Sequence, residues 1–447
     1  MKKNIILGLI SFLLLQTTVF ANAIDKTIAK SDISKANVSV SVKDVKTGKT
    51  VYKLNEKRSQ IPASTLKLIT LSASLDTLGY DYEFTTEMFK STNNELFIKL
   101  GGDPFLTYGD LRGLFNTARD KKILEPKAIY LDDYVFDDVE WGEGWQWDDD
   151  LNPLMPKISS YNLDGNLLHI VINPTYKNAP AQIYPSRFYP VTFMNLVTSG
   201  GSANSVKLSR NNSIAPDLIT AEGSVSHQVI KKIPVNNPKR YFVLRCEDAV
   251  KSAKIYYYGK YLQKKTPSSN IYSVDKVTHP IDTAINAILK QSNNLVAESV
   301  FKAAGGKFVQ NTGSLGHSQQ MLNAYFDKLG LNYDDIRIVD GSGVSKNNII
   351  TADFMSEFLV KIADNEEFVN SMATAGEGTL TTRMLYFRDN LRAKTGTLSD
   401  VSTIAGYITS RNGKRYAFDI MINDPKSKSA DKKVLEEYIL RDIYTNF

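Results

Sequence analysis

Cysteine is almost absent from this sequence: Cys246 is the only one in 447 residues. A single thiol cannot form a disulfide within the chain or build a cysteine metal cluster. The fold must therefore be held together by its apolar core. A chain of this length can bury ample apolar surface, and the same length implies more than one domain.

Histidine is also scarce, and none of the four lies in a local protease or esterase signature such as G-x-S-x-G. They are His169, His227, His279 and His317. A triad assembled from distant residues stays open, but we interpret each histidine as a surface or packed residue. No metal or organic cofactor is indicated.

Long apolar runs are missing after the first twenty residues, so no later segment is expected to span a bilayer. The chain opens MKKNIILGLISFLLLQTTVFANA, in which two lysines precede an apolar run and small residues follow at Ala21 and Ala23. This layout predicts a secretory signal peptide over 1–23, with a retained membrane anchor as the alternative. We expect an exported, periplasmic protein that begins near Ile24 and is soluble or loosely bound to membrane or wall.

The excess of positive charge is small. Loss of Lys2 and Lys3 with the signal lowers the formal net charge from +6 to +4. No dense Lys/Arg block or recognition motif accompanies this excess, which argues against a nucleic-acid partner. Affinity for an anionic polymer such as a cell wall stays possible.

Hydrophobic periodicity divides the chain into three stretches. Residues 37–58 predict a β-hairpin around a Lys-Thr-Gly-Lys turn, and residues 62–79 predict a helix that ends at Gly79. The middle, about 85–275, is dense in Tyr, Asn, Asp and Pro and predicts small β-rich units with turns. Beyond 280 the helical spacing returns in 281–291, 293–306, 317–331 and 351–365.

The end of the chain is expected to be rich in strands. RIVD (337–340) predicts a strand that runs into DGSGVS. NLRAKTG and the pair STIAGYITSR and KRYAFDIMIN, joined by an Asn-Gly turn, predict further strands, and 432–447 a last helix. The fold class is therefore α/β (α+β): an antiparallel sheet with helices on its faces, interrupted by β-rich inserted domains.

Ser64 and Lys67 stand at positions i and i+3 of the first predicted helix, in the stretch PASTLKLIT. The lysine amine can reach the serine hydroxyl at this spacing, and a buried, neutral lysine can act as a general base. The spacing is common, however. It recurs at Ser273/Lys276, Ser299/Lys302 and Ser429/Lys432.

The order of motifs singles out Ser64. An S-x-N follows at Ser292 and Asn294, between two predicted helices, and Lys394-Thr395-Gly396-Thr397 enters a predicted strand near the C-terminus. Other copies exist: Ser202/Asn204, Ser345/Asn347, and Lys46-Thr47-Gly48, which we interpret as turn chemistry.

With these three motifs in order, the chain resembles the penicillin-recognising serine acyl-transferases, namely penicillin-binding proteins and serine β-lactamases. Lys67 and Ser292 are 225 positions apart, which leaves room for inserted domains. GGDPFLTYGDL, GWQWDDD, DGSGVS and AGEGTLTTR are similar to stretches of class C low-molecular-mass penicillin-binding proteins, the D-alanyl-D-alanine carboxypeptidase/endopeptidase family (peptidase S13).

The resemblance implies a domain division. Residues 24–85 and 275–447 would form the transpeptidase-like catalytic domain, 86–165 and about 240–274 inserted domain II, and about 166–240 inserted β-rich domain III. Members of the family commonly carry a cysteine pair in the insertion, which this chain lacks.

The resemblance also implies a role for each motif residue. Ser64 would attack the carbonyl of the penultimate D-alanine of a wall peptide, Lys67 would take its proton, and Ser292 would relay a proton to the departing amine. Asn294, Lys394, Thr395, Gly396 and Thr397 would bind substrate. Lys394 would be the second cation that helps to hold Lys67 neutral. The backbone N–H groups of Ser64 and Thr397 would form the oxyanion hole.

Asp149, in GWQWDDD, aligns with an aspartate that in this family faces the amine of the peptide's diamino acid; a solvated acidic loop over 148–150 is the alternative. We expect Trp141, Trp145 and Trp147 to pack the insert, and Ser342 to be structural. The expected partners are peptidoglycan stem peptides and β-lactam inhibitors. The alternatives are a β-lactamase or esterase on the same scaffold, or a non-catalytic envelope protein that binds the wall.

Overall fold

The computed structural model describes residues 23–201, 204–210 and 215–447. The predicted signal peptide lies outside these residues except for Ala23. In the described part of the chain, no helix is long and apolar enough to cross a membrane.

The central sheet of the catalytic region has five antiparallel strands in the order β14-β15-β16-β1-β2. The strands are β1 (Val38–Asp44), β2 (Thr50–Leu54), β14 (Leu391–Thr397), β15 (Val401–Thr409) and β16 (Arg415–Asn423). The predicted hairpin and the three strands predicted after residue 390 are confirmed. Because β1 pairs with β16, the first and last strands of the chain lie side by side in the middle of the sheet.

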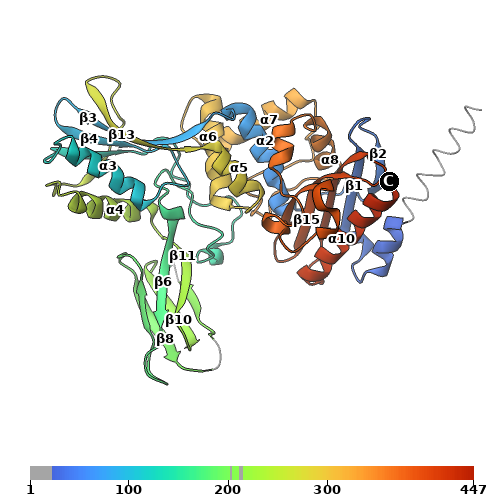
Figure 1. Ribbon diagram of the computed structural model, residues 1–447, viewed down its shortest axis with the longest axis horizontal. Helices are drawn as coiled ribbons and strands as arrows, with labels where there is room; N and C mark the ends of the chain where they lie inside the picture. Colours follow the sequence, from blue (N-terminus) through green and yellow to red (C-terminus); the bar gives the residue numbers. More distant parts are fainter. Residues whose placement is uncertain (1–22, 202–203, 211–214) are drawn as a thin grey trace, which may run out of the picture.

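Helices cover both faces of this sheet (Figure 1). α10 (Ser429–Asn446) packs on one face, where Ile439 and Ile443 share a buried cluster with Ile404 and Ile408 of β15. The other face carries seven helices of the described chain: η2 (Ala63–Leu66), α2 (Lys67–Leu78), α5 (Ile281–Leu289), α6 (Asn294–Val309), α7 (Leu315–Leu329), α8 (Ala352–Lys361) and α9 (Glu366–Ser371). The predicted class, an antiparallel sheet with helices on its faces, is confirmed.

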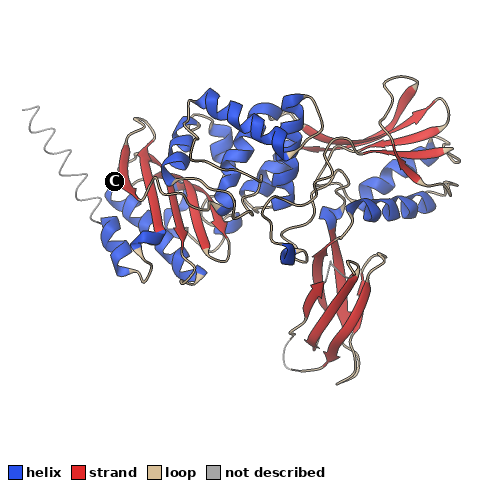
Figure 2. Ribbon diagram, turned by 180° about the vertical axis from the view of Figure 1, so that it is seen from behind, coloured by secondary structure: helices blue, strands red, loops and turns tan. Residues whose placement is uncertain are grey.

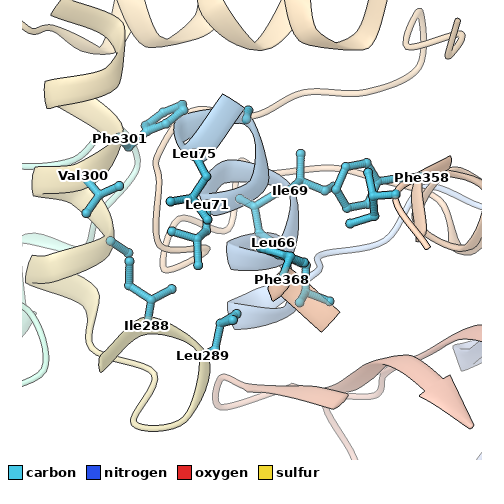
Figure 3. Packing of buried hydrophobic residues seen from close by; sticks show 14 of the residues in the cluster. Leu66, Ile69, Leu71, Leu75, Ile288, Leu289, Val300, Phe301, Phe358 and Phe368 are labelled. Atoms are coloured by element: carbon cyan, nitrogen blue, oxygen red, sulfur yellow. The ribbon is translucent and has the colours of Figure 1, made fainter. Parts of the chain in front are cut away.

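Helix α2 is enclosed along most of its length, and Asp76 near its end is its one exposed residue. Figure 3 shows Leu71 and Leu75 packed toward Ile288 of α5 and Phe301 of α6, with Ile69 on another side. Ten of the twelve residues of α2 are buried, Lys67 among them. The helix stops where predicted, because Gly79 adopts φ 83°, a left-handed conformation that a glycine enters without steric cost.

The insertion begins and ends on neighbouring strands. β3 (Glu83–Ser91) leaves the catalytic region beside β13 (Ile271–Pro280), which returns to it. Together with β4 (Glu95–Lys99), β5 (Ala128–Asp132) and β12 (Tyr261–Gln263) they form a five-stranded sheet in the order β12-β5-β4-β3-β13. α3 (Tyr108–Asp120) and α4 (Pro238–Ser252) cover one of its faces (Figure 1).

A separate lobe of six strands projects from this unit (Figure 2). One sheet has the order β8-β10-β9 and the other β11-β6-β7. The strands are β6 (Leu167–Asn173), β7 (Gln182–Pro185), β8 (Thr192–Ser199), β9 (Lys207–Arg210), β10 (Leu218–Val225) and β11 (Val229–Pro234). The limits of the three predicted domains stay a prediction.

Two sequence-based expectations are wrong. RIVD is not a strand, because Arg337 forms only one isolated bridge, to Ile349. The purely β-rich interpretation of the middle overlooks α3 and α4. Two glycines obscure the helical spacing of α3, although Thr107 and Asp110 form a capping box. For α4, the sequence signals that predict a helix start were Asn237 as N-cap and Pro238 at the first helical position.

We predict that Gly343→Ala lowers the free energy of unfolding by about 2 kcal/mol or more. Gly343 has φ 78°, and a Cβ there would lie 2.0 Å from the carbonyl oxygen of Ala63, which as backbone cannot move aside cheaply. The matched control is Gly316→Ala in α7, where a Cβ meets nothing within 4 Å. Urea unfolding should leave that control unchanged or stabilised by less than about 1 kcal/mol; equal effects would refute the packing argument.

Candidate active site

Ser64 lies in η2, one turn before α2 begins. Ala63 before it has φ 48°, a left-handed conformation that is costly for a residue with a Cβ and that recurs at functional sites. Thr65 anchors the turn by donating its hydroxyl to the carbonyl of Pro62 at 2.7 Å. Ser64 is thus held half-buried at the edge of the helical core.

The amine of Lys67 has no exposed surface and contacts three acceptors. Lys67 Nζ lies 2.9 Å from Ser64 Oγ, 2.7 Å from Asn294 Oδ1 and 2.5 Å from the carbonyl oxygen of Ser342. The three acceptors come from η2, the start of α6 and the loop after α7. The three segments therefore converge on Lys67 Nζ.

Burial lowers the pKa of Lys67 from 10.5 to about 7, because an ammonium loses its hydration there. The carboxylates of Asp340 and Glu298 oppose this effect. A substantial fraction of the amine is thus neutral near pH 7. A neutral amine has two N–H donors and one lone pair; when Asn294 and Ser342 accept the two donors, the lone pair faces Ser64. This is the arrangement that proton removal from a serine needs.

Ser292 and Asn294 bracket the start of α6 as predicted. Ser292 has φ 59°, again left-handed, and its Oγ accepts a hydrogen bond from Lys394 Nζ at 2.8 Å. Asn294 accepts from Lys67 and donates through Nδ2 to the carbonyl of Leu154 at 2.8 Å. The S-x-N therefore connects both lysines and ties them to the insertion.

Lys394 is as deeply buried as Lys67. Burial, and after it the neighbouring Lys67, hold the pKa of Lys394 well below 10.5. Removal from water is the main cause of the lowered pKa of Lys67, as the expected burial implies, and the contribution of Lys394 as a second cation stays a prediction.

Strand β14 passes directly beside the serine. A Cβ on Gly396 would lie 2.8 Å from the backbone nitrogen of Ser64 and 2.3 Å from Thr403 Oγ1, so only glycine allows this approach. Thr395 donates its hydroxyl to Thr379 at 2.7 Å. Thr397, at the end of the strand, is exposed.

A cleft of about 520 Å³ opens over these groups. Its walls include Ser64, Asp149, Ser292, Asn294, Thr395 and Thr397. Asp149 is half-buried in η3 (Trp147–Asp149) of the insertion and forms no ion pair within the described chain, whereas Asp150 pairs with Arg210 at 3.4 Å. The predicted substrate residues Asn294, Thr395, Thr397 and Asp149 thus share one cleft, and Lys394 and Gly396 lie behind it.

Glu298 and Asp340, which the sequence interpretation missed, hold the loop that carries Ser342. Glu298 accepts the N–H groups of Gly341 and Ser342 at 3.0 and 2.8 Å. Asp340 accepts those of Gly343 and Ser345 at 2.8 and 2.7 Å. Burial and the Asp340 carboxylate raise the pKa of Glu298 to about 7. Asp340 is the first residue of DGSGVS, so the similarity of that stretch to the family was the sequence signal that could have pointed to it.

Trp145 joins the insertion to the same loop. Its Nε1 donates to Asp340 at 2.9 Å, and its ring packs with Met155, Ile158 and Trp141. The expectation that the tryptophans pack the insert is correct for Trp141 and Trp145 and wrong for Trp147, which is 79% exposed.

The competing motifs do not assemble such a site. Ser299 accepts from Asn162 while Lys302 pairs with Asp137 at 2.6 Å. Lys432 donates to the carbonyl of Asp400. In the early Lys-Thr-Gly, Thr47 bonds to Asp44 within the hairpin turn, as interpreted from the sequence.

The histidines of the described chain lie elsewhere: His279, for example, pairs with Asp103 at 2.6 Å. Among the described residues, no group of three His, Cys, Asp or Glu side chains could hold a metal ion.

Comparison with known proteins gives consistent matches. The profile of the D-Ala-D-Ala carboxypeptidase 3 (S13) family matches residues 20–440. D-alanyl-D-alanine carboxypeptidase DacB of Haemophilus influenzae is 24% identical over 462 residues, 95% of either chain. D-alanyl-D-alanine carboxypeptidase of Actinomadura sp. (strain R39) is 25% identical over 438 residues, 90% of this chain and 80% of the relative.

Among solved structures, penicillin binding protein 4 (dacB) from Haemophilus influenzae has a TM-score of 0.83 at 23% identity and covers 94% of this chain and 99% of that one. The two chains share one fold.

The depressed pKa of Lys67 predicts a pH dependence of stability. Between about pH 7 and 10.5 the unfolded chain binds more protons at Lys67 than the folded one, so folding becomes more favourable as pH rises through this range. The free energy of unfolding of the wild type, minus that of Lys67→Met, should rise by up to about 1.4 kcal/mol per pH unit there. Urea unfolding at several pH values measures it; a flat difference would mean an ordinary lysine.

Proposed function

Because the chain belongs to the D-Ala-D-Ala carboxypeptidase 3 (S13) family, we propose that Ser64 is the nucleophile of a serine-type D-Ala-D-Ala carboxypeptidase that acts on peptidoglycan stem peptides. The resemblance inferred from the three ordered motifs is thereby confirmed. The observation that carries the assignment of the nucleophile is the contact of Lys67 with Ser64 at 2.9 Å in a buried site.

The first half-reaction forms an acyl-enzyme. Neutral Lys67 removes the proton of Ser64, and Oγ attacks the carbonyl carbon of the penultimate D-alanine. The backbone N–H groups of Ser64 and Thr397 stabilise the oxyanion, at about 3 kcal/mol for each donor. Collapse of the tetrahedral intermediate breaks the peptide bond, and the departing amine takes a proton from Ser292 or Lys67.

The contact of Lys394 with Ser292 at 2.8 Å supports a role for Ser292 in this proton transfer, because it places the hydroxyl in a chain from one lysine to the cleft. In the second half-reaction water attacks the ester, and Lys67 again removes a proton. The same chemistry cleaves a cross-link when the leaving amine belongs to a neighbouring peptide, which would make the enzyme a DD-endopeptidase.

Substrate binding follows from the same cleft. Thr395 and Thr397 would bind the terminal carboxylate beside Lys394, and Asn294 the substrate amide. Asp149 would face the amine of the diamino acid, since its carboxylate lines the cleft without an ion-pair partner in the described chain. β-Lactams, which present an acylating carbonyl in place of the D-Ala-D-Ala bond, would acylate Ser64 and inhibit.

The signal-like pattern over 1–23 supports a location outside the cytoplasmic membrane, in the periplasm, where the wall polymer is found.

A fluorescent penicillin should label the wild type covalently, and Ser64→Ala should abolish the label because the acyl acceptor is lost. The matched control is Ser273→Ala, which removes an exposed serine of another S-x-x-K pair. Gel fluorescence after denaturation measures both. Label that persists in Ser64→Ala would place the nucleophile elsewhere.

Asp149→Asn should reduce kcat/KM about tenfold on a pentapeptide with a free diamino-acid amine, the loss of one charged hydrogen bond, and less on the same peptide with that amine acetylated. Asp148→Asn, one position away and exposed, serves as the control. Release of D-alanine measures the rate. Equal losses on the two peptides would remove the proposed role of Asp149.

A further inference from the structure

The segment 251–265 carries an unusual local charge. It contains five lysines (Lys251, Lys254, Lys260, Lys264 and Lys265) and no Asp or Glu, so its charge of +5 matches almost the whole excess of the chain. All five are exposed, and none forms an ion pair with a described residue. Lys264 lies over the ring of Tyr130 and Lys265 over that of Tyr134, which does not neutralise their charge. Five cations without an ion pair in one short segment form a strongly positive surface.

Tyrosines are interleaved with these lysines. Tyr258 is 95% and Tyr256 59% exposed, whereas Tyr257 anchors the loop by donating its hydroxyl to the carbonyl of Lys260 at 2.6 Å. A groove of about 610 Å³ runs between the end of α4 and β12, lined by Lys251, Lys254, Tyr256, Tyr258 and Tyr261, with Glu247 as the one acid. A concave surface with exposed aromatic rings and cations suits an extended polymer strand better than a flat surface does.

The groove lies far from the cleft. The backbone N–H of Tyr256 donates to the carbonyl of Leu124, and that of Lys127 donates to the carbonyl of Asn94. The loop before β12, the turn before β5 and the turn between β3 and β4 therefore lie at the same end of the inserted sheet. The opposite end is where β13 runs into α5 and the catalytic region. The nine residues of β3 span the distance between the two ends, about 30 Å. A small peptide in the cleft cannot reach the groove, but a polymer can occupy both.

We propose that the groove, with the lysines and tyrosines of 251–265, is a second binding site for the peptide-bearing wall polymer. This inference rests on the proposed function, because each uncleaved stem peptide ends in a D-alanine carboxylate and a strand that bears many of them is a polyanion. The lysines bind these carboxylates, and the tyrosine rings stack on sugar faces. The site holds the polymer while the cleft cuts successive peptides.

The kinetic test compares one polymer with one small substrate. Lys254→Gln/Lys260→Gln should lower the rate of D-alanine release from insoluble peptidoglycan about fivefold, because two surface ion pairs are lost, and 0.5 M NaCl should shrink this difference. Release from a soluble pentapeptide should stay unchanged. The charge-matched control, Lys46→Gln/Lys49→Gln in the hairpin turn of the catalytic region, should match the wild type on both substrates.

Tyr258→Ala tests the aromatic contribution separately. Its ring is almost fully exposed, so the substitution should preserve the melting temperature while lowering the polymer rate about threefold. A polymer rate that changes in neither variant would show that these residues are only solvated and would overturn the proposal. A fall on both substrates would overturn it as well, since it would indicate an effect on the catalytic region.

Binding can be measured without turnover. Ser64→Ala protein should co-sediment with insoluble peptidoglycan, and the Lys254→Gln/Lys260→Gln change in that background should weaken this binding. This result stands even if the enzyme fails to release D-alanine, so failure of the site and failure of the proposed function are distinguishable. Lysine-dependent sedimentation with phosphatidylglycerol vesicles, together with lysine-independent binding to peptidoglycan, would identify a membrane surface and overturn the proposal.

Discussion

The burial of one lysine amine is the constraint on which the rest of this structure depends. An ammonium removed from water is strongly destabilising unless acceptors surround it or it gives up its proton. Lys67 meets three acceptors, and each is supplied by a different segment of the chain. The enclosure of α2 by α5, α6 and α8 maintains the burial. Much of the architecture of the catalytic region can be understood as a shell of segments that excludes water from Lys67 Nζ.

Two carboxylates complete the shell without contacting Ser64. Glu298 and Asp340 accept backbone N–H groups of the loop 340–345 and thereby aim the carbonyl of Ser342 at Lys67. Their charges raise the pKa of Lys67 while burial lowers it, and the balance lies near neutrality. The insertion takes part as well, because Trp145 bonds to Asp340 and Leu154 to Asn294. The inserted unit is therefore a structural component of the site.

The sequence predicts the parts of this site that depend on local spacing. Ser64 and Lys67 are neighbours by helical geometry, and the Asn-Gly turn and the Gly79 stop mark real element ends. Glu298 was not predictable in this way, because Glu298 and Lys302 at i and i+4 imitate an exposed ion pair. In the fold both faces of α6 are covered, and Lys302 pairs with Asp137 instead. The predicted strand at RIVD is absent for a related reason. Its β-branched residues favour a strand, but no partner strand passes beside them.

The pairing of β1 with β16 brings Val38 opposite Ile422, so the central sheet closes only when the last strands are present. Lys394 follows Lys67 by 327 residues, and β14 supplies the wall beside Ser64. A nascent chain therefore carries Ser64 and Lys67 for most of its synthesis before the strand that forms one wall of their site exists. The order of elements along the chain therefore delays assembly of this site until the C-terminal strands have been made.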